Sequence, residues 1–529
     1  MNRPFQQLSR TLTRFGPILA LLAGAMQTLT YAPYEFWPLG VFSAGLMYQV
    51  LLFSPPGKTA FIGWYYGLGV FGSGASWVYV SIHDYGYTAA PLAALLTFLF
   101  AAFLALFCVL QAVVFKRFIL RNRSHSLLLN SDQPAQPVLL SALSFAAVWV
   151  LTDWLRSWLL TGFPWLYLGY GHVLSPLANL APLGGVHLIT LVVALTGALL
   201  SLFATPFRSR SSLRWGALMT ATLWLGAALL PGEGFTQPAS STPLKVALAQ
   251  GNINQLLKWQ AEHRMHSIEV YERLSAPLWE DTDILLWPET AIPFFQDTAD
   301  FLLQDLSRRA QDTHTTLITG IPYRLPPRPD EDYPVMHNSI TSLGSGSGIY
   351  HKQKLVPFGE YVPLQSVLRG IIRFLDLPMS AFQPGQPNQP GLLANGYVAA
   401  PFICYEIVYP DFVAESAQGS HFLVTISNDA WFGASIGPLQ HLQIAQMRSL
   451  ETGRYTLRGT NNGITAIVDP RGRVMERAPQ FEEAMLIGTI TPMTGNTPFM
   501  LTGSLPVVLF CFLICVLTRQ ARPPEKPLT

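Results

Sequence analysis

The segment from Tyr85 to Phe115 carries no charged side chain, and it limits what this chain can fold into. A helix crosses the hydrocarbon core of a membrane with about 20 apolar residues, and a lipid-exposed segment must satisfy its own backbone polar groups. The whole chain of 529 residues agrees, because only 12% of its residues are charged against about 25% in soluble proteins. The sequence therefore predicts a multi-pass membrane protein, and its net charge of +2 gives no reason to expect nucleic-acid binding.

Apolar stretches long enough to span a membrane recur along the chain, and we predict eight membrane-spanning helices. They lie near residues 15–34, 36–55, 60–82, 88–115, 138–158, 183–206, 213–231 and 497–518. The stretch 161–183 is also apolar, but it is rich in Gly, Pro and Trp, so we expect a loop or an interfacial segment there.

Clusters of Lys and Arg flank the predicted spans, and positive charge marks the cytoplasmic side of a membrane protein. They comprise Arg3, Arg10 and Arg14; Lys116, Arg117, Arg121 and Arg123; Arg208, Arg210 and Arg214; and Arg519, Arg522 and Lys526. With eight spans all four clusters fall on one side. The region between spans seven and eight is then expected outside the cytoplasm, with 519–529 as a cytoplasmic tail. The first span lacks a small-residue cleavage site and further spans follow it, so we do not expect a cleaved signal peptide.

Residues 244–491 alternate short apolar runs with amphipathic stretches, which predicts a layered α/β sandwich. Expected strands are Lys245–Gln250, Asp283–Trp287, Leu317–Pro322, Asn338–Leu343, Gly348–Lys352, Val398–Ile403, Phe422–Ser427, Ile464–Asp469 and Met485–Ile490. Expected helices are His263–Ala276, Ala299–Asp312 and Gln440–Arg454. Pro470-Arg471-Gly472 is expected to form a hairpin turn.

Cys404 is the one cysteine outside the apolar segments, and it follows a predicted strand. An exported domain with one cysteine forms no internal disulfide, so the thiol is either buried or used. Glu289 and Lys352 stand at the ends of other apolar stretches. A base, a cation and a thiol are the parts of thiol acyl chemistry. The plainer alternatives are a buried structural cysteine, a surface carboxylate after a Trp-Pro turn and a solvated lysine.

The motifs around these three residues resemble those of the nitrilase (carbon–nitrogen hydrolase) superfamily, and further motifs resemble the apolipoprotein N-acyltransferase family within it. The superfamily motifs are Trp287-Pro288-Glu289-Thr290, the run from Tyr350 to Tyr361, and Ile403-Cys404-Tyr405-Glu406. The family motifs are Ser427-Asn428-Asp429-Ala430-Trp431-Phe432-Gly433, Gln440-His441, Ala32-Pro33-Tyr34 and Gly162-Phe163-Pro164-Trp165. The resemblance covers essentially the whole chain. Lys354 departs from the pattern, since many relatives have His there.

The resemblance implies a multi-pass bundle joined to a periplasmic nitrilase-like αββα domain in the bacterial inner membrane. It implies transfer of an acyl chain from a phospholipid, typically phosphatidylethanolamine, to the α-amine of a lipoprotein's diacylglyceryl-cysteine. Cys404 would be the nucleophile that forms a thioester in a ping-pong scheme, Glu289 the base and Lys352 the oxyanion-stabilising cation.

Four further residues receive roles from the same resemblance. Glu360 would orient Lys352, Tyr405 and Glu406 would shape the pocket, and Trp259 would help to bind substrate, although an interfacial Trp is an alternative for it. No cofactor and no metal are expected, and the protein is expected to be a monomer.

Other charged residues have mainly structural interpretations. Arg448, Glu451, Arg454 and Arg458 share a helical spacing, which favours a solvated or ion-paired face over support of the active site. Asp153 and Arg156 are expected to pair inside the bundle. His172 and His187 lack partners at metal-ligand spacing.

Two other functions compete with acyl transfer to a lipoprotein. A membrane-bound amidase or nitrile hydrolase would keep the fold, but a simple anchor needs one span rather than eight. A transporter with an exported binding domain would be expected to show internal repeats and polar sites at mid-membrane, and the sequence shows no clear repeat.

Overall fold

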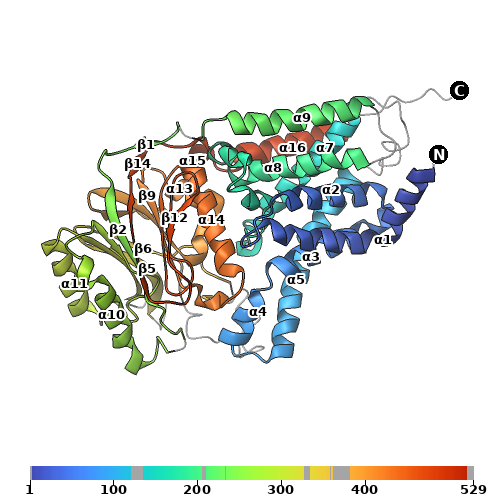
Figure 1. Ribbon diagram of the computed structural model, residues 1–529. Helices are drawn as coiled ribbons and strands as arrows, with labels where there is room; N and C mark the ends of the chain where they lie inside the picture. Colours follow the sequence, from blue (N-terminus) through green and yellow to red (C-terminus); the bar gives the residue numbers. More distant parts are fainter. Residues whose placement is uncertain are drawn as a thin grey trace. The chain divides into compact units, whose positions relative to one another are not determined.

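The computed structural model describes residues 3–120, 135–204, 210–232, 234–255, 257–326, 334–357, 359–361 and 382–520. The chain divides into two compact units (Figure 1). The helical unit comprises Met1–Tyr79, Ala89–Gly232 and Thr502–Thr529, and the sheet unit comprises Val80–Thr88 and Glu233–Leu501.

Helices cover most of each apolar segment predicted from the sequence. They are α1 (Arg3–Gln27), α2 (Pro38–Phe53), α3 (Thr59–Gly74), α5 (Ala90–Val113), α7 (Ala135–Arg156), α8 (Ala181–Ser201), α9 (Arg210–Leu229) and α16 (Leu505–Gln520). Two predicted spans were too long. Helix α3 ends at Gly74, before the short α4 (Val78–Val80), and a separate α15 (Pro498–Thr502) precedes α16.

Four helical stretches of the described chain are long and apolar enough to cross a membrane. They are Thr11–Thr30, Ala90–Ile119, Gln136–Arg156 and Pro176–Ala204, whereas α2 and α16 are apolar but shorter. The count of eight spans therefore stays a prediction.

Small residues let the helices of this unit approach closely. An added Cβ at Gly45 of α2 would lie 2.6 Å from the carbonyl oxygen of Gly197 on α8, and one at Gly197 would meet the carbonyl oxygen of Val41. Helices that cannot rely on a hydrophobic driving force associate through such tight contacts.

The predicted ion pair inside the bundle is confirmed. Arg156 Nη2 donates to Asp153 Oδ1 at 2.8 Å, and its Nη1 donates to the carbonyl oxygens of Phe163 and Trp165 at 2.7 and 2.6 Å. These contacts tie α7 to the stretch 161–183, which is irregular chain and short 3-10 helices up to residue 180, enters α8 at Ala181, and is mostly buried.

The described part of the sheet unit holds two six-stranded sheets and a two-stranded ribbon of β1 (Gln237–Pro238) and β14 (Met493–Thr494). The first sheet has the order β13 (Ala484–Ile490), β2 (Leu244–Gln250), β3 (Ile284–Leu286), β4 (Thr316–Leu325), β5 (Val335–Gly344), β6 (Ile349–His351). The second has the order β12 (Val474–Arg477), β11 (Ala466–Val468), β10 (Thr456–Thr460), β9 (Phe422–Ser427), β8 (Tyr397–Ile403), β7 (Leu392–Ala394). The central strands β2–β4 and β8–β10 run parallel within their sheets.

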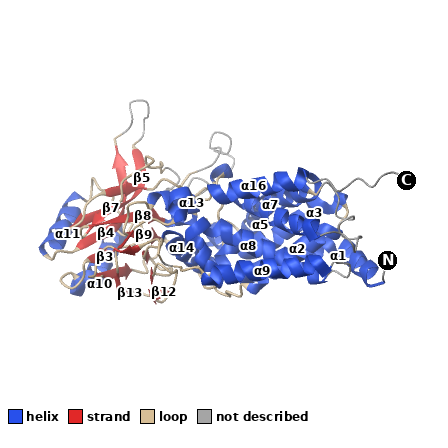
Figure 2. Cartoon of the chain, turned by 90° about the horizontal axis from the view of Figure 1, so that it is seen from above, coloured by secondary structure: helices blue, strands red, loops and turns tan. Residues whose placement is uncertain are grey.

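The sheets pack face to face between helices, which confirms the predicted sandwich. Alternate residues such as Val246 and Leu248 of β2 join a core between the sheets. Their neighbours Ala247 and Ala249 face a second core under α10 (Ala261–Ser275) and α11 (Asp300–Asp312). On the other side lie α13 (Pro410–Ser416) and α14 (Gly437–Thr452), so Figure 2 shows helices flanking the strands on both sides.

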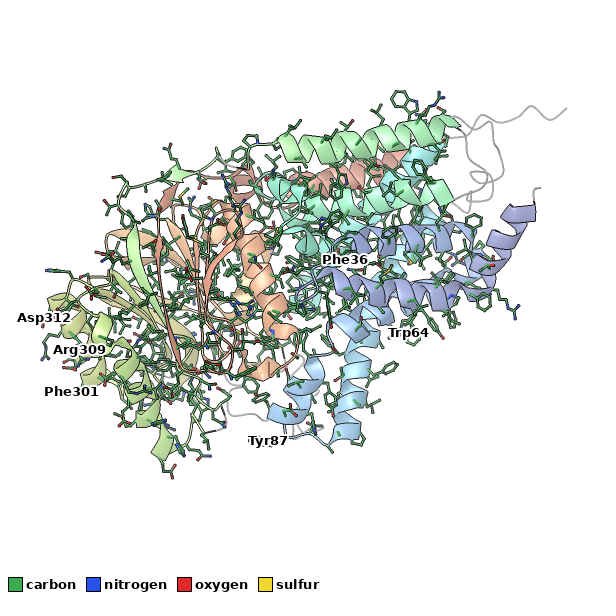
Figure 3. All side chains as sticks on the ribbon, in the orientation of Figure 1. Phe36, Trp64, Tyr87, Phe301, Arg309 and Asp312 are labelled. Atoms are coloured by element: carbon green, nitrogen blue, oxygen red, sulfur yellow. The ribbon has the colours of Figure 1, made fainter. Side chains whose placement is uncertain are left out.

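Helix α11 illustrates the outer layer. Leu306 and Ala310 are buried against the first sheet, whereas Phe301 and Asp312 are exposed and Arg309 is half-buried; these last three residues are labelled in Figure 3. This apolar stripe explains why the periodicity predicted the helix correctly.

Candidate active site

The candidate residues stand where strands end. Glu289 follows β3, Cys404 follows β8 and Asn428 follows β9, all at the carboxyl ends of parallel strands, and Lys352 follows β6. Ligands and reacting groups of α/β folds gather at such ends because the chain leaves the sheet there. The sequence placed Glu289, Lys352 and Cys404 correctly at strand ends.

Two carboxylates share one ammonium group. Lys352 Nζ lies 2.8 Å from Glu360 Oε2 and 3.9 Å from Glu289 Oε1. Asn338 on β5 donates to both carboxylates, at 2.7 Å to Glu289 and 3.1 Å to Glu360. Lys352, Glu289 and Glu360 are all buried, so this charge cluster is shielded from water.

Backbone N–H groups also hold both carboxylates. The backbone N–H of Asn428 donates to Glu289 Oε2 at 2.7 Å, and that of Val356 donates to Glu360 Oε2 at 2.9 Å. Asn338 and Asn428 had no predicted role. Only the position of Asn428, directly after a predicted strand, could have indicated it.

The buried charged groups shift one another's pKa values. Burial raises the pKa of Glu289, with Glu360 adding to the rise and Lys352 opposing it. Burial alone would lower the pKa of Lys352, but Glu360 and Glu289 reverse this and raise it. The lysine is therefore a fixed positive charge, while Glu289 is a stronger base than an ordinary carboxylate.

Cys404 occupies a strained turn. Its φ of 53° lies in the left-handed region, which non-glycine residues seldom adopt and which clusters at functional sites. Burial raises the pKa of its thiol to about 12, with Glu289 adding to the rise and Lys352 opposing it. The resting group is thus a thiol, and a nearby base must remove its proton before the sulfur can attack.

The Glu406 side chain connects the segment that carries Cys404 with the segment that follows Lys352. Its Oε1 accepts from the Tyr350 hydroxyl at 2.9 Å and from the backbone N–H groups of Gln353 and Lys354 at 2.6 and 3.1 Å. Its Oε2 accepts from the N–H of Ile403 at 2.8 Å. Burial raises the pKa of Glu406 to about 7 against these backbone donors. The carboxylate therefore fixes the lysine strand end relative to the cysteine turn.

The other predicted residues lie nearby in the sheet unit. Tyr405 is buried and packs edge-on against the ring of Tyr409, with 5.4 Å between centroids. Trp259 is half-buried, and its carbonyl accepts from Arg264. Its neighbour Lys258 is fully buried and donates to the Glu289 carbonyl at 3.1 Å and to the Thr290 hydroxyl at 2.8 Å. Lys258 was missed because no local pattern distinguishes a buried lysine from a solvated one, and lysine is seldom fully buried.

The predicted charged helical face is partly wrong. Arg448, Glu451, Arg454 and Arg458 are all buried rather than solvated. Arg448 and Glu451 do pair, at 3.1 Å, on α14. The helix, however, ends at Thr452, so Arg458 lies on β10, where it donates to Asp429 Oδ2 at 2.6 Å.

In the described ranges no group of three or more His, Cys, Asp or Glu side chains is arranged to hold a metal ion. His172 hydrogen-bonds Ser175 and His187 hydrogen-bonds Ser504, each at 2.9 Å.

Family comparisons match most of the chain. Residues 23–199 match the apolipoprotein N-acyltransferase N-terminal domain, and residues 245–499 match the carbon-nitrogen hydrolase family. The apolipoprotein N-acyltransferase of Azotobacter vinelandii is 47% identical over 94% of this chain and 94% of its own length. That of Pseudomonas aeruginosa is 46% identical over 97% of this chain and 98% of its own. The chain belongs to the apolipoprotein N-acyltransferase family.

Membership in the apolipoprotein N-acyltransferase family makes the chain an acyltransferase and the sheet unit a carbon-nitrogen hydrolase fold. A solved carbon-nitrogen hydrolase superfamily protein from Xanthomonas campestris is also similar, at 15% identity and a TM-score of 0.36 over 51% of this chain and 97% of its own. The match across both units disfavours the two competing functions, a simple anchored amidase and a transporter.

Proposed function

We propose that this chain transfers an acyl chain from a membrane phospholipid, phosphatidylethanolamine above all, to the N-terminal α-amine of a diacylated apolipoprotein. The observation that carries the proposal is the buried cluster of Glu289, Lys352 and Glu360, in which the charges of Glu289 and Lys352 act on the Cys404 thiol. Family membership supports the lipoprotein as acceptor.

In the first half-reaction Glu289 takes the thiol proton, and the sulfur attacks the carbonyl carbon of the phospholipid ester. The oxyanion of the tetrahedral intermediate is stabilised by the fixed charge of Lys352 and by the backbone N–H of Tyr405. Collapse breaks the ester C–O bond and leaves a thioester on Cys404. The departing lysophospholipid oxygen takes the proton from Glu289.

In the second half-reaction the neutral α-amine of the lipoprotein attacks the thioester. Glu289 takes a proton from the amine, the C–S bond breaks, and the proton returns to the Cys404 sulfur. Both half-reactions use one thiol and one base, so the substrates bind in turn, in a ping-pong scheme that needs no cofactor.

Glu360 positions Lys352 in this scheme, since it is the nearer of the two carboxylates. Glu406 positions the turn that carries Cys404. Tyr405 and Trp259 are proposed to border the acyl chain. The basic clusters and apolar helices support a multi-pass protein of the bacterial inner membrane with its sheet unit in the periplasm. We propose that it acts as a monomer.

Intact mass of the purified full-length protein tests the proposal. Wild type incubated with phosphatidylethanolamine should gain the mass of one acyl group, and Cys404→Ala should gain none. Adding a diacylated lipopeptide should then remove the acyl group and give an N-acylated peptide. An unchanged wild-type mass, or equal acylation of Cys404→Ala, would show that Cys404 is not the acyl carrier, and loss of the acyl group to water alone would favour a hydrolase.

A further inference from the structure

One buried side chain contacts the backbone of the nucleophile and has no part in the scheme above. His441, on the first turns of α14, places its Nε2 3.2 Å from the carbonyl oxygen of Cys404. Its Nδ1 lies 3.1 Å from Arg458 Nη2 and 3.2 Å from Asp429 Oδ1. The ring also packs edge-on against Phe432, with 6.0 Å between centroids.

The partners of His441 fix the positions of its protons. The Cys404 carbonyl can only accept, so Nε2 must carry a proton. Arg458 can only donate, so Nδ1 accepts from it when the ring is neutral. Burial and Arg458 lower the pKa of His441, which favours the neutral ring. Asp429 is held by other donors as well, because its Oδ1 accepts from the Ser427 hydroxyl at 2.7 Å and its Oδ2 accepts from Arg458 at 2.6 Å.

His441 thereby helps to hold one peptide plane, that between Cys404 and Tyr405, which begins the 3-10 helix Cys404–Val408. A trans peptide is planar, so its C=O and N–H point in opposite directions. When the Cys404 carbonyl oxygen points toward α14, the N–H of Tyr405 points away from α14. Because Cys404 has a φ of 53°, the plane sits at a conformation that the local chain does not favour and that its surroundings must hold.

We infer that His441 is a positioning residue, which orients the Cys404–Tyr405 peptide so that the Tyr405 N–H faces the developing oxyanion. Arg458, which is itself held by Asp429, donates to Nδ1 and so holds the ring in the required tautomer. The inference rests on the proposed function, because the proposed thioester step is where the oxyanion forms.

Two reactions of the same thiol separate this role from a merely structural one. Acylation by the p-nitrophenyl ester of a fatty acid passes through an oxyanion and releases p-nitrophenolate. Alkylation by iodoacetamide displaces iodide and forms no oxyanion, although it needs the same thiolate. Both rates are measured on the full-length protein in detergent, for wild type, His441→Leu and His441→Gln. His266→Leu, at an exposed position on α10, is the control.

His441→Leu should slow acylation by about tenfold to a hundredfold, below the 10²–10³ lost when an oxyanion donor itself is removed, and leave alkylation unchanged. His441→Gln should recover most of the acylation rate, since its amide can donate to the Cys404 carbonyl. His266→Leu should match wild type in both reactions.

Equal losses in both reactions, or no loss in acylation, would overturn the inference. So would a His441→Gln variant as slow in acylation as His441→Leu. Failure of the wild type to form any acyl-enzyme, by contrast, would overturn the proposed function itself.

Discussion

At the residue scale, the two carboxylates around Lys352 differ in how strongly the lysine holds them. Glu360 makes contacts of 2.8 and 2.9 Å to Nζ, whereas Glu289 lies 3.9 Å away. The positive charge of Lys352 therefore mainly balances that of Glu360, the closer carboxylate. The more distant one keeps a raised pKa and is free to exchange a proton. This difference supports the proposal that Glu289, rather than Glu360, is the base.

We therefore expect the rate of Cys404 acylation to rise with pH through the raised pKa of Glu289. The base is active when deprotonated, so a raised pKa moves the acid limb of the profile above the ordinary value of about 4.3. Glu289→Gln should lower the rate by about 10²–10⁴ and abolish that limb. Single-turnover acylation rates with a p-nitrophenyl ester, measured for wild type and Glu289→Gln between about pH 4 and 9, give both the size of the loss and the position of the acid limb. A variant that kept the limb would show that another group is the base.

The sequence indicated the three central residues and, through the family resemblance, Glu360, but not the two asparagines that hold the carboxylates. Glu289, Lys352 and Cys404 each end a predicted strand, so local patterning located them. Asn338 lies within a strand, and its contact with Glu289 depends on how β5 pairs with β4 and β6. Such contacts arise from the assembled sheet, which no local pattern encodes.

At the scale of elements, β4 packs closely against the loop that carries Glu289. A Cβ added at Gly320 would lie 2.5 Å from the Thr290 nitrogen, 2.7 Å from the Pro288 oxygen and 2.8 Å from Glu289 Cα. All three are backbone atoms, which cannot rotate aside as a side chain can. The close approach of strand and loop sets the position of the Glu289 carboxylate.

Gly320→Ala should accordingly move the Glu289 loop while the sandwich remains folded. A displacement of about 1 Å can cost about 10²-fold in rate, so we expect a loss of that order in Cys404 acylation. Gly226→Ala on α9, where an added methyl meets nothing within 4 Å, is the matched control. Acylation rates together with circular dichroism of both variants make the test. Full activity in Gly320→Ala would mean that the loop is not constrained by β4.

The end of α14 explains why Arg458 was wrongly assigned to a helical face. Gly453 has a φ of 60° and ends α14, as glycine commonly does at a helix C-terminus. The helical spacing of charges continued past it, and β10 was therefore missed. Strands β7 and β12 were missed as well, because strands of three or four residues show too little alternation to be recognised.

At the scale of the whole molecule, composition predicted the membrane part, and the alternation of strand and helix patterns predicted the sandwich. The number of spans depends on helix lengths, which the sequence defines poorly. Helix α3 has 16 residues where the apolar run suggested 23 positions, 60–82. Helix ends depend on tertiary contacts, so hydropathy locates a span better than it bounds one.

The basic clusters make a prediction about orientation that does not depend on exact helix ends. If spans alternate and positive charge stays in the cytoplasm, the chain near Ser241 lies outside and the chain near Ser211 lies inside. Both serines are exposed, and Cys108, Cys511 and Cys515 are buried. In a Cys404→Ala background, Ser241→Cys should react with a membrane-impermeant maleimide in intact spheroplasts.

Ser211→Cys is the matched control, because it should react only after lysis. The Cys404→Ala background alone should remain unlabelled, which verifies that the buried thiols do not contribute. Labelling of Ser211→Cys and not of Ser241→Cys in intact spheroplasts would place the sheet unit in the cytoplasm. An acceptor that is a lipoprotein at the outer face of the membrane would then be unreachable, so this measurement tests the acceptor as well as the topology.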